Sequence, residues 1–200
     1  MSKSQAVATP SLLEAKQESV RTTIGEHALR LFAERGYEAS TVDDIARAAG
    51  IGRRTFFRYF DGKDAVVLWR FDQFARRAVA LLRARPSREP GLTAMERALT
   101  EASEFYNQDP EQSLRILKLT EATRSLLAQQ LLQQDRWKTW FAEVLRERGK
   151  HVEGSLQSDI TAAVALEAMA LAVRRWVDAP ELGLSALIAR CFAALRKGVR

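Results

Sequence analysis

The pattern of apolar positions along the chain is helical almost throughout. Apolar residues recur at intervals of three and four in most segments, and no alternating run bounded by turn residues marks a β-strand. Glycine and proline are sparse, and the long segments are rich in residues with high helix propensity, such as alanine, leucine, glutamate and arginine. The sequence therefore predicts an all-α fold.

A short glycine-containing break separates two amphipathic segments near the N-terminus. The first segment opens at Thr41, whose hydroxyl can cap a helix, with Asp44 at the spacing of a capping box. Gly50 ends this segment because glycine adopts a positive φ without steric cost, and the next helix begins at Arg53. Two helices joined by such a turn form a helix-turn-helix, whose second helix enters the major groove of DNA.

The second helix of this motif has an aromatic side and a basic side. Phe56 and Phe60 are four residues apart and are predicted to point inward together. The outward side carries Arg53, Arg54, Thr55, Phe57, Arg58 and Tyr59. Arginines on a short helix are often only a solvated face. The cap, the turn and the aromatic anchors occur together here, which favours a helix that reads a DNA groove.

The residues around this motif carry a family resemblance. The matching positions are Ile24, Ala28, Leu31, Phe32, Gly36 and Tyr37, then Ala39–Val42, Ile45, Ala46, Ala49–Ile51, Thr55–Phe60, Lys63 and Asp64. On these positions, the span from about Arg21 to Val66 resembles the DNA-binding domain of the TetR family of bacterial transcriptional regulators. Two positions depart from the family pattern: Gly52 stands where serine often caps the recognition helix, and Asp61 stands where proline often precedes the next helix.

The sequence predicts four consecutive regions. Residues 1–18 are small and polar and are expected to form a disordered tail, with the alternative that residues 12–16 extend the first helix. Residues 19–66 form the helix-turn-helix domain, and residues 67–90 form a linking fourth helix and a loop, with the break between domains at Pro86–Gly91. Residues 91–200 form a helical domain, which the resemblance implies to bind a ligand and to dimerise.

The exposed residues of the motif divide into two expected roles. Arg53 and Arg54 are the candidates for base contacts, because arginine binds guanine O6 and N7 with two hydrogen bonds. Thr55 and Phe57 are expected to touch thymine methyl groups or the backbone. The expected phosphate contacts, which hold register without reading sequence, are Arg21, Thr41, Tyr59 and Lys63, and Arg58 lies on the same surface.

The last two predicted helices carry more apolar surface than one packing partner buries. One partner inside the subunit and another across a two-fold axis account for this surplus. The candidate interface residues are Leu166, Leu187, Cys191 and Leu195. The TetR resemblance implies the same homodimer, and two copies would read an imperfect palindrome with half-sites about one helical turn apart or a multiple. The alternative is that both faces pack within one subunit.

The resemblance further implies an inducer cavity in the second domain. The candidate lining residues are Phe105, Leu117, Trp137, Phe141, Met169 and Val173. Aromatic stripes at helical spacing are also typical of a plain core, so that alternative stays open. The segment 113–140 resembles that of actinobacterial family members suspected of sensing acyl-coenzyme A-like compounds, whose phosphates Arg115, Lys118 and Arg124 would meet.

Charge and composition add the expected partner and compartment. A formal charge of +6 and a pI near 9.8 favour a polyanionic partner such as double-stranded DNA. Cys191 is the only cysteine, so no internal disulfide forms and a reducing cytoplasm is the expected compartment. The N-terminus has no signal-peptide core, and the most apolar run, Ala162–Val173, is expected to be too short for a bilayer.

The sequence carries no pattern typical of an enzyme. His27 and His151 are far apart, and there is no glycine-rich phosphate loop, no paired metal-binding histidines and hence no expected metal or cofactor. The predicted function is a ligand-responsive regulator, acting as a repressor on a palindromic operator and released by a small hydrophobic or acyl-type inducer. The alternative is a non-specific architectural DNA-binding protein without an inducer.

Overall fold

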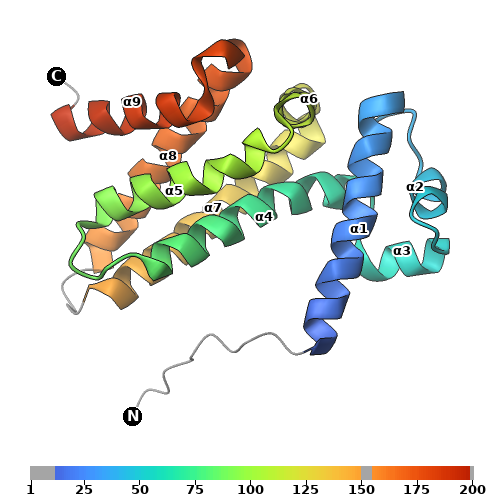
Figure 1. The fold of residues 1–200 in the computed structure, drawn as a ribbon, viewed down its shortest axis with the longest axis horizontal. Coiled ribbons are helices and arrows are strands. Elements are labelled where there is room, and N and C mark those ends of the chain that lie inside the picture. Colours follow the sequence, from blue (N-terminus) through green and yellow to red (C-terminus); the bar gives the residue numbers. More distant parts are fainter. Residues whose placement is uncertain (1–11, 150–154, 199–200) are drawn as a thin grey trace. The chain divides into compact units, whose positions relative to one another are not determined.

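A computed structural model describes residues 12–149 and 155–198, and within these ranges the structure is helical and contains no strand (Figure 1). The elements are α1 (Leu12–Arg35), α2 (Val42–Ala48), α3 (Arg53–Tyr59), α4 (Lys63–Ala84), α5 (Gly91–Asn107), α6 (Pro110–Ala122), α7 (Arg124–Arg148), α8 (Ser155–Asp178), the 3-10 helix η2 (Pro180–Leu182) and α9 (Leu184–Lys197). The prediction of an all-α fold is confirmed.

The first helix is longer than expected. Helix α1 begins at Leu12, so residues 12–18 are helical although the sequence led us to expect a disordered tail over 1–18. The segment contains good helix formers and no glycine or proline, so nothing stops the helix there. Leu12 and Leu13 remain exposed, and residues 1–11 lie outside the described ranges.

The chain divides into two units between Trp69 and Arg70, inside the continuous helix α4. Sequence placed the break at Pro86–Gly91 because proline and glycine gather there. In the structure this loop belongs to the second unit, since Phe71, Phe74 and the rest of α4 bury their apolar side chains within that unit. A helix can therefore end one unit and begin the next without any break in its own sequence.

The helix-turn-helix forms as predicted. The Thr41 hydroxyl accepts a hydrogen bond from the Asp44 amide (3.1 Å), and the Asp44 carboxylate accepts one from the Thr41 amide (3.2 Å), which completes the capping box. Gly50 ends α2 with φ of 66°. Phe56 and Phe60 are buried, as their four-residue spacing predicted. These contacts fix the direction of the short helix α3.

Two contacts join α1 and the turn that follows it to the first part of α4 within the first unit. The ring of Trp69 lies directly on Gly25, where a Cβ atom would come within 2.3 Å of the Trp69 Cζ3 atom. At the other end of α1, the Tyr37 hydroxyl donates to the Asp64 carboxylate, and Lys63 Nζ donates to the Tyr37 carbonyl (2.9 Å). Only glycine permits the first contact, because any side chain would push the two helices apart.

Helix α8 is the central element of the second unit and packs against α5, α7 and α9. The segment Leu156–Asp178 is long and apolar enough to cross a membrane by length and composition. Its most apolar 18 residues have a mean hydropathy of 1.4, and 39% of them are buried. The apolar run Ala162–Val173 is shorter than this segment, because the helix extends beyond the run at both ends. Central helices of soluble proteins have the same composition, since they are apolar on several sides.

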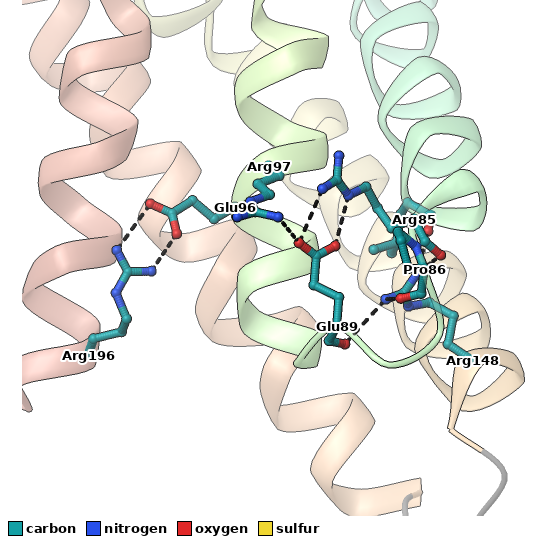
Figure 2. Close-up of polar contacts among 8 residues, drawn as sticks. Arg85, Pro86, Glu89, Glu96, Arg97, Arg148 and Arg196 are labelled. Carbon is teal, nitrogen blue, oxygen red and sulfur yellow. Dashed lines mark hydrogen bonds and ion pairs between the residues drawn. The ribbon is translucent and has the colours of Figure 1, made fainter.

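A polar network closes the end of the second unit where α4 turns into α5 (Figure 2). The Arg148 guanidinium, at the end of α7, donates to the carbonyl oxygens of Leu82 (2.9 Å), Arg85 (2.6 Å) and Pro86 (2.9 Å), with a weaker bond to Glu89 (3.4 Å). The Glu89 carboxylate in turn accepts hydrogen bonds from two arginines, Arg85 and Arg97. The last carbonyl groups of α4 thus find partners that the helix itself cannot supply.

Candidate nucleic-acid interface and ligand cavity

The outward face of α3 is basic and open to solvent. Arg53, Arg54, Phe57 and Arg58 are exposed, and Phe57 keeps 43% of its surface accessible. The opposite face is held by Phe56, which is fully buried. This face therefore combines exposed arginines with one exposed aromatic ring.

The two candidate base-reading arginines differ in their surroundings. Arg53 Nη1 lies 2.8 Å from the Asp43 carboxylate of α2, and its guanidinium lies 5.4 Å from the Phe57 ring centroid. Arg54 makes no hydrogen bond or ion pair with the residues that the structure describes. Arg54 can therefore contact a base directly, whereas Arg53 must first leave Asp43.

Arg21 and Arg58 border one surface hollow beside the recognition helix, together with Tyr59. The Arg21 guanidinium lies 5.0 Å from the Phe60 ring centroid, and its Nε atom is buried without a hydrogen-bond partner in the described chain. Arg58 lies over the Tyr59 ring at 5.1 Å. The structure thus brings three of the predicted contact residues together around one hollow.

Lys63 and Thr41 are engaged within the protein. Lys63 bonds to the Tyr37 carbonyl, lies 4.2 Å from the Tyr37 ring centroid and 3.6 Å from the Glu38 carboxylate, and its side chain is only 24% exposed. The Thr41 hydroxyl donates to the Asp44 carboxylate (2.6 Å), a bond that holds the pKa of Asp44 below its ordinary value. Both side chains position the motif before any DNA is bound.

Tyr37 also helps to hold the helix-turn-helix motif in place. Burial, together with the hydrogen bond to the Asp64 carboxylate, raises the pKa of Tyr37, so its hydroxyl stays protonated and remains a donor. The residue was part of the family pattern in sequence, but its role in holding α1 against the start of α4 follows only from the folded geometry.

The second unit encloses a cavity of about 470 Å³ among α4, α5, α6, α7 and α8. Four of the six residues predicted to line it do so: Leu117, Trp137, Met169 and Val173. Phe105 and Phe141 are not on its wall. Phe105 lies on the outer side of α5 under the Arg70 guanidinium (3.5 Å), and Phe141 is fully buried in the core.

The structure adds aromatic residues that the sequence analysis did not assign to this cavity. Phe71 and Phe74 of α4 line it, although sequence placed them in a linking helix, and so does Tyr106 of α5. Trp137 donates its indole N–H to the Asp72 carboxylate (3.0 Å), which fixes the ring in the wall. The apolar positions of α4 were the sequence signal that could have indicated Phe71 and Phe74 as lining residues. The helices that form the rest of the cavity wall lie far away in sequence, so the signal was not sufficient.

The mouth of the cavity is mixed in charge. It carries three carboxylates, Glu121, Glu167 and Asp178, and two cations, Lys138 and Arg174. The basic residues expected to meet phosphates, Arg115, Lys118 and Arg124, are exposed and lie outside the cavity wall, and Arg115 pairs with Glu111 at 2.6 Å.

A second, shallower groove of about 720 Å³ runs along the outer sides of α8 and α9. Cys191 and Leu195 line it with Leu171, which is 41% exposed. The other two predicted interface residues, Leu166 and Leu187, are buried inside the subunit, and Leu166 lines the cavity of about 470 Å³ instead. Burial raises the pKa of the Cys191 thiol above its ordinary value.

Two family models and several known regulators are similar to this chain. Residues 24–68 match the family model described as bacterial regulatory proteins, tetR family, and residues 89–200 match the model described as MftR C-terminal domain. The chain is 29% identical to the HTH-type transcriptional regulator TcmR of Streptomyces glaucescens over 185 residues, which cover 89% of this chain and 82% of TcmR. It is 26% identical over 176 residues to the transcriptional regulator MftR of Mycobacterium tuberculosis, covering 88% of this chain and 89% of MftR.

Solved structures share the fold. Thermus thermophilus FadR, a TetR-family transcriptional repressor crystallised with lauroyl-CoA, superimposes with a TM-score of 0.57 at 20% identity, covering 90% of this chain and 96% of FadR. At this identity the likeness is evidence for the fold alone.

Proposed function

The chain belongs to the TetR family of bacterial transcriptional regulators, and we propose that it is a ligand-responsive repressor that binds a palindromic operator as a homodimer. The observation that carries this proposal is the basic face of α3, which is held rigidly by buried aromatic residues and left open to solvent. Regulators of this family are not enzymes, and we propose that this one acts in the cytoplasm.

We assign different roles to the residues of this face. Arg54, which has no partner in the described chain, reads a guanine edge, and Arg53 joins it after exchanging Asp43 for DNA. Thr55 and Phe57 contact thymine methyl groups or the backbone. The phosphate contacts come from Arg21, Arg58 and Tyr59, with smaller contributions from Thr41 and Lys63, which hold the motif together.

The groove on α8 and α9 is the proposed dimer interface. Besides Leu171, the exposed apolar residues of α8 include Leu156 and Ile160, which fall on one helical stripe with Val164 in the groove. An exposed apolar stripe of this length is typical of a surface that a second subunit covers. Two α3 helices related by the dimer axis would then reach successive major grooves.

The cavity is the proposed inducer site, for a small hydrophobic or acyl-type molecule. Its volume of about 470 Å³ falls in the range of about 300–1,000 Å³ usual for ligand pockets. Helix α4 contributes Phe71 and Phe74 to the wall and begins beside the DNA-binding motif at Lys63. A ligand releases DNA only if it prefers the conformation that fits DNA poorly, since equal affinity for both conformations changes nothing.

Operator binding is tested by mapping protected DNA upstream of the neighbouring genes and then measuring variant affinities at one salt concentration. Arg54→Ala is expected to cost about 1–3 kcal/mol and to relax preference at one base pair of each half-site. Arg88→Ala, an exposed arginine in the α4–α5 loop, is the control and should bind normally. Equal losses on operator and random DNA for Arg54→Ala would instead favour the non-specific architectural alternative.

The dimer is tested with a charge placed in the groove. Leu171→Lys should convert the dimer to monomer in sedimentation equilibrium, because a buried unpaired ammonium is costly at an apolar interface. Leu182→Lys is the matched control, since Leu182 is similarly exposed (44%) but lies in η2 outside the groove. An unchanged dimer in the first variant would place the interface elsewhere.

A further inference from the structure

We propose that the cavity selects uncharged aromatic ligands that carry a hydrogen-bond acceptor, and that it discriminates against coenzyme A thioesters. This inference rests on the proposed function and narrows it, because that function admits either a hydrophobic or an acyl-type inducer. Three properties of the cavity wall carry it: its aromatic surface, one hydroxyl that donates to no residue of the described chain, and the charges at its mouth.

The wall is aromatic on several sides. Phe71 and Phe74 of α4, Tyr106 of α5 and Trp137 of α7 all line it. The rings of Phe74 and Tyr106 lie 5.1 Å apart at an interplanar angle of 40°. Aromatic rings attract one another by stacking and edge-to-face contacts, so such a wall favours a flat aromatic ligand over a flexible alkyl chain of equal area.

Tyr106 supplies a hydrogen-bond donor that the protein does not use. The residue is 95% buried, since only 5% of its surface is exposed, and it lines the cavity. Its hydroxyl makes no hydrogen bond to any residue in the described part of the chain. Burial raises the pKa of Tyr106, so the hydroxyl remains protonated. A protonated hydroxyl on the cavity wall can donate a hydrogen bond to an acceptor on a ligand.

The mouth of the cavity carries more negative than positive charge. Of its two cations, Lys138 lies 3.9 Å from both the Asp135 and the Glu167 carboxylates, which offset its charge. The other cation, Arg174, is outnumbered by the two remaining carboxylates, those of Glu121 and Asp178. Coenzyme A carries several phosphate charges, which this mouth would repel. By contrast, an uncharged ligand meets no such penalty.

The unused hydroxyl is tested with two ring systems that differ by one carbonyl group. The probe is N-phenyl-1-naphthylamine, an uncharged dye that fluoresces in apolar sites, displaced by 9-fluorenone or by fluorene. Wild-type protein is expected to bind fluorenone about 5- to 10-fold more tightly than fluorene, and Tyr106→Phe should remove this difference. The variant should fold normally because the hydroxyl has no partner in the described chain. Equal affinities in wild type would overturn the role of Tyr106.

The charge selectivity is tested with a matched pair of dyes. The compound 8-anilinonaphthalene-1-sulfonate has the same ring skeleton as the neutral dye plus one sulfonate, and it should bind at least about 10-fold more weakly. The double variant Glu121→Gln/Asp178→Asn should reduce the difference in affinity between the two dyes, because it removes two negative charges from the mouth. Both carboxylates are exposed and have no structural partner among the described residues, so the variant should fold normally. Displacement of the neutral dye by lauroyl-CoA more readily than by fluorenone would refute the proposal.

Operator affinity is measured on the same preparations without any ligand. Normal operator binding together with failure of the dye predictions would refute the ligand class and leave the regulator intact. Fluorenone binding that leaves operator affinity unchanged would support the described cavity chemistry but refute the cavity as an inducer site.

Discussion

Replacing Arg148 removes the group that ties the end of α7 to the end of α4. In the structure its guanidinium donates to four backbone carbonyl oxygens, three of them at 2.6–2.9 Å and the fourth at 3.4 Å (Figure 2). The variant Arg148→Met keeps much of the aliphatic stem and loses every one of these bonds. Arg148→Lys keeps the charge but cannot span the divergent carbonyls, so its effect should be intermediate.

The expected loss follows from the bonds. A hydrogen bond from a charged donor contributes about 1.5–3 kcal/mol when it is well shielded. Arg148 is only partly buried, and water can replace some of the lost bonds, so the three short bonds together should be worth about 2–4 kcal/mol rather than their full sum. At about 2–4 °C per kcal/mol for a chain of this size, the melting temperature should fall by about 4–16 °C.

Thermal unfolding followed by circular dichroism measures this difference. All variants are compared at one protein concentration, because the melting temperature of the proposed dimer depends on concentration. The matched control is Arg146→Met, two residues earlier on the same helix. Arg146 forms an exposed side-chain pair with Asp159 (2.6 Å), which should be worth at most about 1 kcal/mol. If Arg148→Met melts no lower than the control, the carbonyl bonds do not stabilise the end of α4 and the reasoning fails.

Three further predictions concern other contacts. Gly25→Ala should destabilise the protein by about 1–3 kcal/mol in denaturant unfolding, because the new methyl group meets the tryptophan ring on α4, whereas Gly62→Ala, with open space around it, should be close to neutral. Asp43→Asn should raise operator affinity about 1.5- to 5-fold in a fluorescence-anisotropy titration, since it releases Arg53 and removes a charge that repels phosphate. Unchanged or weaker binding would show that the ion pair does not restrain Arg53 from DNA. The hydrogen bond from Arg85 lowers the pKa of the Glu89 carboxyl below its ordinary 4.5. The stabilising effect of this carboxylate is therefore present above pH 4.5 and is lost as the pH falls through the lowered pKa. Thermal melts from pH 6 to pH 3 should show a shallower loss of stability for Glu89→Gln than for wild type.

The division between what could and could not be predicted is clearest at the cavity. Leu117, Trp137, Met169 and Val173 line the cavity, and each lies on the inward stripe of its own helix. Phe141 lies on such a stripe as well, yet it faces solid core. Periodicity shows which side of a helix is inward, but it does not show whether the space beyond that side is filled. That depends on helices that are distant in sequence.

The same limit applies to the recognition surface. The pattern identified which residues of α3 point outward, but it could not show that Lys63 and Thr41 already have partners or that Asp43 holds Arg53. Charged side chains look alike in a sequence, and their availability depends on neighbours that folding brings within hydrogen-bond distance.

The sequence by itself determined the local structure of this protein: the helices, the capping box at Thr41, the positive φ at Gly50 and the inward side of α3. These follow from interactions between residues at most four positions apart, which amino-acid type and spacing largely specify. The tertiary structure alone decided that α4 belongs to both units, that Gly25 must accommodate Trp69, and that Arg148 closes the α4–α5 turn. Each of these contacts joins distant segments, and its existence depends on how whole helices pack.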